Sequence, residues 1–264
     1  MNLRIITIAA GTLLLGGCAK GELRDITAPV SGARIKFFNF AVATPPAATP
    51  TVSLVPGVNF YANDAKITAI TSGTGTESTL GTTSGGVGNG GLYSVIAPNQ
   101  YKVTGRVAAT TDKGVAIASL PVTLADGKFY SFYMSGYYNT TTKLSEAFAV
   151  EDVFPSLPDV SVAYVRFVNA SANAGAVTLY TRIGTFEFPI GAAVPYKAGG
   201  DFITVPEGLY DLSARIAGSA TSVVTRTGVS FLAGRVYTVS AFGDATVTGT
   251  TAGNRIRLDN TANR

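Results

Sequence analysis

One short motif occurs twice in this chain, first as Ala33-Arg34-Ile35-Lys36-Phe37-Phe38-Asn39 and again as Ala163-Tyr164-Val165-Arg166-Phe167-Val168-Asn169. Three further matches follow in the same order in both copies. They pair residues 58–61 with 177–180, 96–101 with 205–210, and 122–130 with 229–237. Because chance rarely produces several matches in one order, we interpret the chain as a tandem repeat.

The repeats set the expected domain boundaries. We place the first repeat at 33–156 and the second at 157–264, since Phe154-Pro155-Ser156-Leu157-Pro158 carries two prolines that interrupt any strand. The first repeat is longer because of two insertions, at 43–56 and 72–91. The first insertion is rich in proline and the second in glycine, threonine and serine, so both have the composition of loops.

Within each repeat the sequence predicts strands and tight turns. The chain has 30 glycines and only 14% charged residues, and no stretch has the period of an amphipathic helix. Apolar residues alternate along Lys102-Val103-Thr104-Gly105-Arg106-Val107, and Asp126-Gly127 and Ala233-Gly234 are typical of turns between strands. Short strands separated by turns over about 100 residues favour a β-sandwich. We therefore expect an all-β protein with two tandem immunoglobulin-like β-sandwich domains.

Four segments of the second repeat carry a resemblance to a known family. They read Tyr164-Val165-Arg166-Phe167-Val168-Asn169-Ala170-Ser171, Ala176-Val177-Thr178-Leu179-Tyr180, Val205-Pro206-Glu207-Gly208-Leu209-Tyr210 and Leu232-Ala233-Gly234-Arg235-Val236-Tyr237-Thr238-Val239. Together they resemble the domain-of-unknown-function 4397 family, and the first repeat is similar in a more divergent form. The resemblance implies a β-rich, exported protein. The family's usual histidine is Asn169 here, and Asn39 in the first repeat, so any chemistry of that histidine is absent.

The N-terminus has the pattern of an export signal. A short n-region with Arg4 precedes an apolar segment at 5–15, which is too short to span a bilayer as a helix. Leu15-Gly16-Gly17-Cys18 then resembles the bacterial lipobox. We expect a lipoprotein signal peptide at 1–17, a lipid on Cys18 and a flexible tether at 18–32. The alternative is an ordinary secretory signal with a chance cysteine.

The residue after the lipobox bears on location. Ala19, rather than an aspartate, follows Cys18. By resemblance to bacterial sorting signals, this favours a cell-envelope protein of the outer membrane, on its periplasmic or surface-exposed face. The expected partners are therefore the membrane, through the lipid on Cys18, and a surface polysaccharide or a protein.

The composition excludes several classes of function. The chain has no histidine and a single cysteine, which removes Ser-His-Asp and Cys-His hydrolases and histidine-bound metals. Its net charge of +4 is scattered rather than clustered, so we expect no nucleic-acid binding. Neighbouring Glu151 and Asp152 should point to opposite faces of a strand. Asp201, Glu207 and Asp211 flank a turn and are expected to be solvated. We expect no enzyme activity, no cofactor and no metal.

The aromatic run at 129–138 is the one candidate contact surface. By alternation, Tyr130, Phe132 and Met134 should face the core, while Phe129, Tyr133 and Tyr137 share the opposite face. Such a face can stack on sugars or on a partner protein. The alternative is that it packs between the two repeats, since large exposed apolar patches are rare. At the two strand ends, Asn39 and Asn169 are expected to bond local backbone.

These observations lead to two functional hypotheses. The first is a lipid-anchored surface protein with a structural or adhesion-type binding role and no catalysis. The second is a glycan-binding accessory lipoprotein of an outer-membrane uptake system. An aromatic platform in a cleft would favour the second, and a smooth surface with mobile loops would favour the first.

Overall fold

The computed structural model describes residues 30–44, 55–68, 79–155, 159–247 and 249–263. Ser31–Arg264 forms one compact unit. Its described residues form strands and a single 3-10 turn, η1 (Gly88–Gly91), so the all-β prediction is confirmed. The expected signal peptide, Cys18 and most of the expected tether lie outside the described residues.

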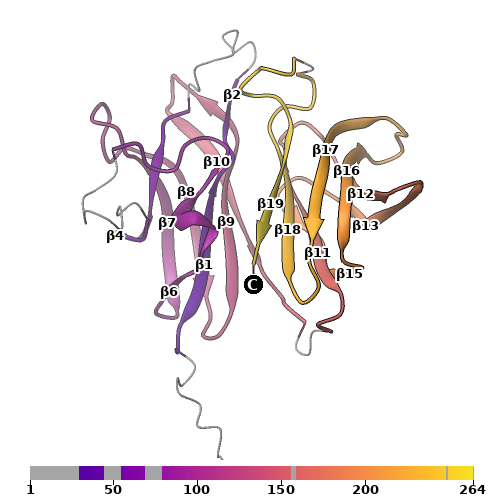
Figure 1. Cartoon of the computed structure of the whole chain (residues 1–264). Helices are drawn as coiled ribbons and strands as arrows, with labels where there is room; N and C mark the ends of the chain where they lie inside the picture. Colours follow the sequence, from indigo (N-terminus) through magenta and orange to yellow (C-terminus); the bar gives the residue numbers. More distant parts are fainter. Residues whose placement is uncertain (1–29, 45–54, 69–78, 156–158, 248, 264) are drawn as a thin grey trace, which may run out of the picture. The chain divides into compact units, whose positions relative to one another are not determined.

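The first sandwich consists of two sheets (Figure 1). We call the sheet of each sandwich that faces the other sandwich its inner sheet, and the remaining one its outer sheet. The inner sheet contains β1 (Ala33–Asn39), β2 (Val42–Ala43), β5 (Gly86–Val87), β6 (Ser94–Ile96), β9 (Phe129–Asn139) and β10 (Leu144–Glu151). The outer sheet contains β3 (Val58–Ala62), β4 (Ala65–Lys66), β7 (Asn99–Val107) and β8 (Ala116–Leu124).

The second sandwich repeats this arrangement. Its inner sheet contains β11 (Ala163–Ala170), β14 (Ala198–Gly199), β15 (Ile203–Val205), β18 (Val236–Phe242) and β19 (Arg257–Ala262). Its outer sheet contains β12 (Val177–Ile183), β13 (Phe186–Val194), β16 (Gly208–Ile216) and β17 (Ser222–Phe231).

The two sandwiches share their topology and register. In each, the first strand pairs in parallel with a late strand, β1 with β9 and β11 with β18. The pairings place Ile35 opposite Tyr130 and Val165 opposite Tyr237, the positions that the sequence matches align. The prediction of tandem sandwiches is therefore confirmed.

A tyrosine at the start of one outer-sheet strand marks both sandwiches. The Tyr101 hydroxyl donates to the carbonyl oxygen of Ala97, and the Tyr210 hydroxyl donates to that of Pro206, each at 2.9 Å. A tyrosine bonded to backbone a few residues upstream is the tyrosine corner of immunoglobulin-like sandwiches. The feature supports the immunoglobulin-like assignment of both sandwiches.

The turns predicted from glycine are present. Gly127 lies between β8 and β9 with φ 70°, and Gly234 lies between β17 and β18 with φ 72°. Positive φ at these positions is easy for glycine and strained for other residues. Both glycines therefore allow the chain to reverse from an outer sheet into the neighbouring inner sheet.

The insertions of the first repeat differ in what the structure describes. Residues 45–54 of the first insertion lie outside the described residues, as do 69–78 around the start of the second. The rest of the second insertion is not a plain loop, because it forms β5 and η1. The amide nitrogen of Gly85 donates to the Asn39 carbonyl oxygen at 2.7 Å, so this segment is bonded to the end of β1.

Each sandwich has its own apolar core. Tyr130, Phe132 and Met134 lie in the core of the first sandwich, as their alternation predicts. Their counterparts Tyr237 and Val239 lie in the core of the second. Burial of one large apolar side chain contributes roughly 1.5–3 kcal/mol, so either core alone is a large stabilising contribution.

A third cluster joins the two inner sheets. The rings of Phe40 and Phe242, from different sandwiches, stack with centroids 4.2 Å apart. The buried apolar members of the cluster are Phe38, Phe40, Val42, Tyr133, Phe148, Val168, Ala170 and Phe242. Both faces of the inner sheets are thus covered, and the sheets form four layers from outer to outer (Figure 1).

Candidate functional site

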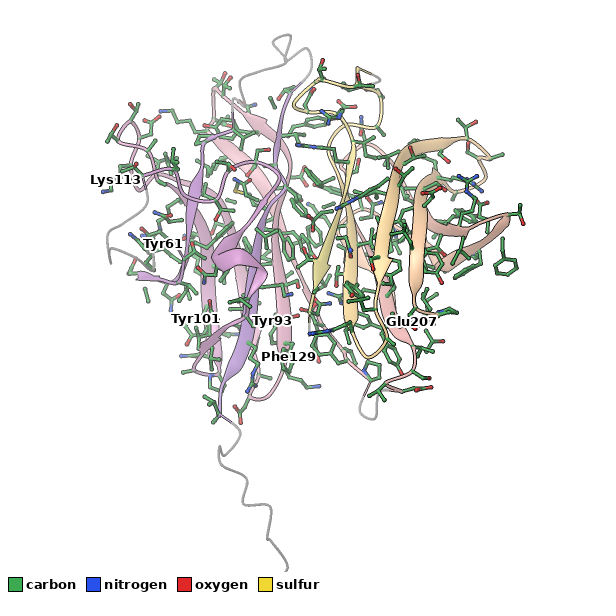
Figure 2. The ribbon with its side chains drawn as sticks, viewed as in Figure 1. Tyr61, Tyr93, Tyr101, Lys113, Phe129 and Glu207 are labelled. Atoms are coloured by element: carbon green, nitrogen blue, oxygen red, sulfur yellow. The ribbon has the colours of Figure 1, made fainter. Side chains whose placement is uncertain are left out.

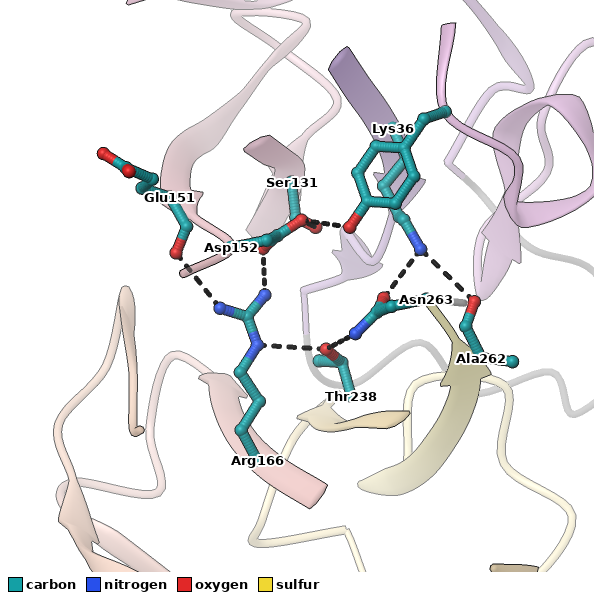
Figure 3. A network of polar contacts seen from close by, with 9 residues as sticks. Lys36, Ser131, Glu151, Asp152, Arg166, Thr238, Ala262 and Asn263 are labelled. Atoms are coloured by element: carbon teal, nitrogen blue, oxygen red, sulfur yellow. Dashed lines mark hydrogen bonds and ion pairs between the residues drawn. The ribbon is translucent and has the colours of Figure 1, made fainter. Parts of the chain in front are cut away.

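Polar side chains gather between the inner sheets, beside the aromatic cluster. They come from strands of both sandwiches and from the segments that follow β10 and β19 (Figure 3). Burying polar groups costs free energy unless each finds a partner, so their bonding pattern indicates their role. The set comprises Lys36, Ser131, Asp152, Arg166, Thr238 and Asn263.

Arg166 is the centre of this network. Its side chain on β11 is 3% exposed, and its guanidinium pairs with the fully buried carboxylate of Asp152, which directly follows β10. Arg166 also donates to the carbonyl oxygen of Glu151 at 3.2 Å and to the Thr238 hydroxyl at 3.0 Å. The Phe202 ring covers its face at 4.7 Å. One side chain of the second sandwich therefore holds the end of the first.

The second oxygen of Asp152 is also occupied. The Ser131 hydroxyl donates to it at 2.8 Å and the Tyr93 hydroxyl at 2.5 Å. Burial and the neighbouring Asp152 raise the pKa of the Tyr93 phenol well above its usual range, so the phenol stays a hydrogen-bond donor. A carboxylate with both oxygens bonded to structural donors is a poor general base.

Lys36 occupies the other side of the network. Its ammonium donates to Oδ1 of Asn263 at 2.7 Å and to the Ala262 carbonyl oxygen at 3.4 Å, and lies 4.2 Å from the centroid of the Tyr93 ring. Burial lowers the pKa of Lys36 from 10.5 to about 8, although the negative charge of Asp152 acts in the opposite direction. Lys36 therefore ties the C-terminal end of the second sandwich to β1.

The network thus functions as a clamp between the sandwiches. Sequence reasoning did not identify it, although the repeat alignment contains a signal. Lys36 and Arg166 align in the two copies, so a basic residue occupies the middle of an apolar strand twice. An isolated solvated lysine or arginine has no reason to recur there. A repeated buried cation predicts a shared polar interface.

The predicted contact residues Phe129, Tyr133 and Tyr137 lie along the contact between the sandwiches rather than on an open face. Tyr133 is fully buried, and its ring stacks on Phe38 at 4.5 Å and on Phe148 at 4.9 Å. The hydroxyl of Tyr137 donates to Asp244 at 2.8 Å.

Phe129 lies at the margin of the same contact. It is half-buried, and its ring meets Tyr93 edge-on at 5.1 Å and Phe154 at 5.0 Å (Figure 2). The guanidinium of Arg34 lies 5.0 Å from its centroid. Packing between the repeats, the alternative considered for this aromatic run, describes the position of Tyr133 and Tyr137, whereas the ring contacts of Phe129 lie within the first repeat.

The two matching asparagines bond backbone, but not only nearby. The Asn39 amide donates to the Thr82 carbonyl oxygen at 2.8 Å, far along the chain. Asn169 donates to Gly175 at 2.7 Å and also to the more distant Val194 at 3.0 Å. Asn169 also accepts a hydrogen bond from the nearby Ser171 N–H at 3.1 Å, so the expected local bonding is present at Asn169, whereas the Asn39 amide instead bonds the distant loop that covers its strand end.

The acidic residues form no catalytic pair in the described structure. Glu151 points outward to Lys128 at 3.0 Å while Asp152 points inward, as predicted for strand neighbours. Asp211 pairs with Arg182 at 3.0 Å, and Glu207 lies in the turn before β16 (Figure 2). In the part of the chain that the structure describes, no three acidic or thiol side chains are grouped to hold a metal ion.

A cleft of about 650 Å³ opens between β17 and β19 of the second sandwich. Three arginines line it together with apolar and hydroxyl side chains, and no acidic side chain does. The lining comprises Ser222, Val223, Val224, Thr225, Arg226, Ala245, Val247, Thr250, Arg255, Ile256, Arg257 and Leu258.

The cleft arginines bond to backbone rather than to carboxylates. Arg226 donates to the Leu258 carbonyl oxygen at 3.0 Å, Arg255 to that of Ala252 at 3.0 Å, and Arg257 to that of Gly253 at 3.1 Å. Burial, and then the charge of Arg255, lower the pKa of Arg257. Other described arginines do form ion pairs: Arg106 with Asp64, Arg166 with Asp152, Arg182 with Asp211 and Arg215 with Glu187.

Comparisons with known proteins agree with the position of the second sandwich. The model of a family described as a domain of unknown function, DUF4397, matches residues 163–260, which run from β11 into β19. The first sandwich lies outside this match although it shares the topology. No curated protein matches the chain.

One solved structure, from Bacteroides fragilis NCTC 9343, is described as a "putative cell adhesion protein". It is 10% identical, and the alignment covers 88% of this chain and 98% of that one with a TM-score of 0.20, too low to indicate a shared fold. The described residues of the present chain contain no helix that is long and apolar enough to cross a membrane.

Proposed function

We propose that the protein is a lipid-anchored, non-catalytic component of the bacterial cell envelope with an adhesion-type binding role. One observation carries this proposal. The two sandwiches are held by an aromatic cluster and by the buried pair of Arg166 and Asp152, which together make one stiff body. A stiff body on a lipid tether can hold a binding surface away from the membrane.

The chemistry of the interior supports a role without catalysis. Asp152 and Asp244 are buried carboxylates, and both are engaged by structural donors. Asp244 accepts hydrogen bonds from Tyr137, Asn173 and Thr246 at 2.6–2.8 Å. Burial alone would raise the pKa of Asp244, but these hydrogen bonds together lower it, so Asp244 stays ionised and fixed rather than poised to move a proton.

The anchor rests on the sequence alone. Cys18, the expected lipid-bearing residue, lies outside the described residues. The lipid on Cys18 is inferred from the lipobox-like sequence before it, and the outer-membrane location from Ala19 after it. An aromatic platform in a cleft would favour the hypothesis of a glycan-binding accessory protein. Because Tyr133 is buried between the sandwiches, that hypothesis loses the feature that motivated it.

A cell-surface experiment tests the proposal. Cells producing the chain are compared with cells producing Cys18→Ser for membrane fractionation, protease accessibility and attachment to protein-coated surfaces. We expect membrane association, and attachment that is lost with Cys18→Ser. Equal attachment by cells lacking the protein would contradict the binding role, and turnover of ester or glycan substrates by the purified chain would contradict the absence of catalysis.

A further inference from the structure

The cleft of the second sandwich lies between two sheet edges. β17 is the outermost strand of its outer sheet, and β19 is the outermost strand of its inner sheet. A strand at a sheet edge presents backbone N–H and C=O groups that no neighbouring strand uses. The lining of the cleft includes the first half of β17 and the start of β19.

The other outer-sheet edges carry features that oppose strand addition. β8, the counterpart of β17, contains Pro121, and β13 contains Pro189. Proline lacks the N–H that a ladder needs, so it protects an edge against added strands. β4 is only two residues long. By contrast, β17 is ten residues long and contains no proline.

Charge distinguishes the same edge. Arg226 and Arg255 line the cleft without a carboxylate partner among the described residues, whereas the Arg257 guanidinium lies 4.8 Å from the centroid of the Phe242 ring in the contact between the sandwiches. Asp259 interacts electrostatically with Arg226 but does not line the cleft. Two guanidinium groups beside one cleft, with no carboxylate paired to either of them, favour an anionic group there.

The remaining lining indicates which kind of anion fits. The half-buried Val223, Val224 and Val247 supply apolar surface to the cleft. The lining has no aromatic side chain on which a sugar ring could stack. An extended peptide in which acidic and apolar residues alternate presents carboxylates and apolar side chains together, along with backbone that can pair with β17.

We propose that the cleft between β17 and β19 docks an extended acidic segment of a partner protein, which adds a strand to the free edge of β17. Its carboxylates pair with Arg226 and Arg255, and its apolar side chains contact the three valines of the lining. This inference rests on the proposed binding role, and it adds the chemistry of the partner that would bind.

A peptide-binding experiment on the full chain in detergent micelles tests this docking. The probe is a labelled ten-residue peptide of alternating valine and glutamate. The control peptides replace glutamate by lysine, or place a proline at the centre so that the peptide cannot form a continuous ladder. Arg255→Glu changes the cleft, and Arg235→Glu makes the same charge change on an exposed turn of the second sandwich. Amide hydrogen exchange of β17 reports strand addition.

We expect the glutamate peptide to bind, both control peptides to bind weakly, and Arg255→Glu to raise the dissociation constant roughly ten-fold or more, with Arg235→Glu near wild type. Amides of β17 should exchange more slowly in the complex. Strand addition would be overturned if the proline peptide bound equally well, if the β17 amides were not protected, or if polygalacturonate displaced the peptide fully. The site itself would be overturned if the glutamate peptide did not bind at all. Association of the chain with itself at this edge would assign the cleft to a second copy.

The same variants separate this inference from the proposed function. If cells producing Arg255→Glu attach as well as wild type, the cleft is not the binding surface while the adhesion role stands. If no attachment depends on the protein but the peptide binds as expected, the adhesion role fails and the docking site stands.

Discussion

Lys36 and Arg166 stand at matching positions of β1 and β11, and both point into the buried interface between the inner sheets (Figure 3). Only Arg166 has a carboxylate partner, since Asp152 pairs with it while Lys36 donates to Asn263 and Ala262. The two sandwiches therefore differ at this site in a complementary way. One copy supplies the ion pair across the interface, and the other supplies the bond to the C-terminus.

Removal of Arg166 should destabilise the protein strongly. Arg166→Met leaves the buried Asp152 carboxylate without its cation, and such a change costs about 3–5 kcal/mol. Urea unfolding followed by circular dichroism measures this free energy. The control is Lys128→Met, which removes an exposed ion pair with Glu151 and should cost less than about 1 kcal/mol. Equal effects of the two variants would show that the buried pair does not hold the interface.

Lys36 should give the stability a distinct pH dependence. Its pKa is about 8 in the folded state and 10.5 as a model group, so above pH 8 the folded chain loses a proton that the unfolded chain keeps. Stability then rises with pH in this window, by about 2 kcal/mol between roughly pH 7 and pH 9.5. Lys36→Met should remove this rise. A wild-type free energy of unfolding with the same pH slope as Lys36→Met would contradict the burial of a charged Lys36.

Tyr133 should act as a core residue. Because its ring is fully buried between Phe38 and Phe148, Tyr133→Ala should lower the free energy of unfolding by about 3–5 kcal/mol. The control is Leu144→Ala, because Leu144 is 54% exposed and its truncation should change stability by less than about 0.5 kcal/mol. A Tyr133→Ala protein of wild-type stability would mean that the two inner sheets do not pack through this ring.

Local patterns were sufficient to predict much of the fold. The alternation from Tyr130 to Met134, the turns at Gly127 and Gly234, and the matching order of segments all depend on short-range chemistry, and the structure has them. The partner of each outward-facing residue could not be predicted in this way. Tyr133 looks like a surface aromatic until a second sheet covers it, and only the tertiary packing of one repeat on the other supplies that sheet.

The same limit explains why the sequence did not predict the polar network around Arg166 or the cleft between β17 and β19. Asp152 and Arg166 are close in sequence but belong to different sandwiches, so their pairing depends on how the chain crosses between them. Arg226 and Arg255 are ordinary charged residues in the sequence. They become a candidate site only because β17 and β19 are edge strands of two different sheets.

Lipidation can be tested independently of the fold. Cys18→Ser removes the thiol that we propose to carry the lipid, so the protein should move from the detergent phase to the aqueous phase in Triton X-114 partitioning. Mass spectrometry of the N-terminal peptide should find a lipid on Cys18 in the wild type only. Unchanged partitioning of the variant would contradict the lipoprotein assignment.

Differential scanning calorimetry of the full chain tests most directly whether the two sandwiches are one body. If the aromatic cluster and the pair of Arg166 and Asp152 couple them, the chain should unfold in one transition, with calorimetric and van 't Hoff enthalpies in agreement. Arg166→Met should lower the temperature of that transition or split it. Two separate transitions in the wild type, with Arg166→Met shifting neither, would contradict the account.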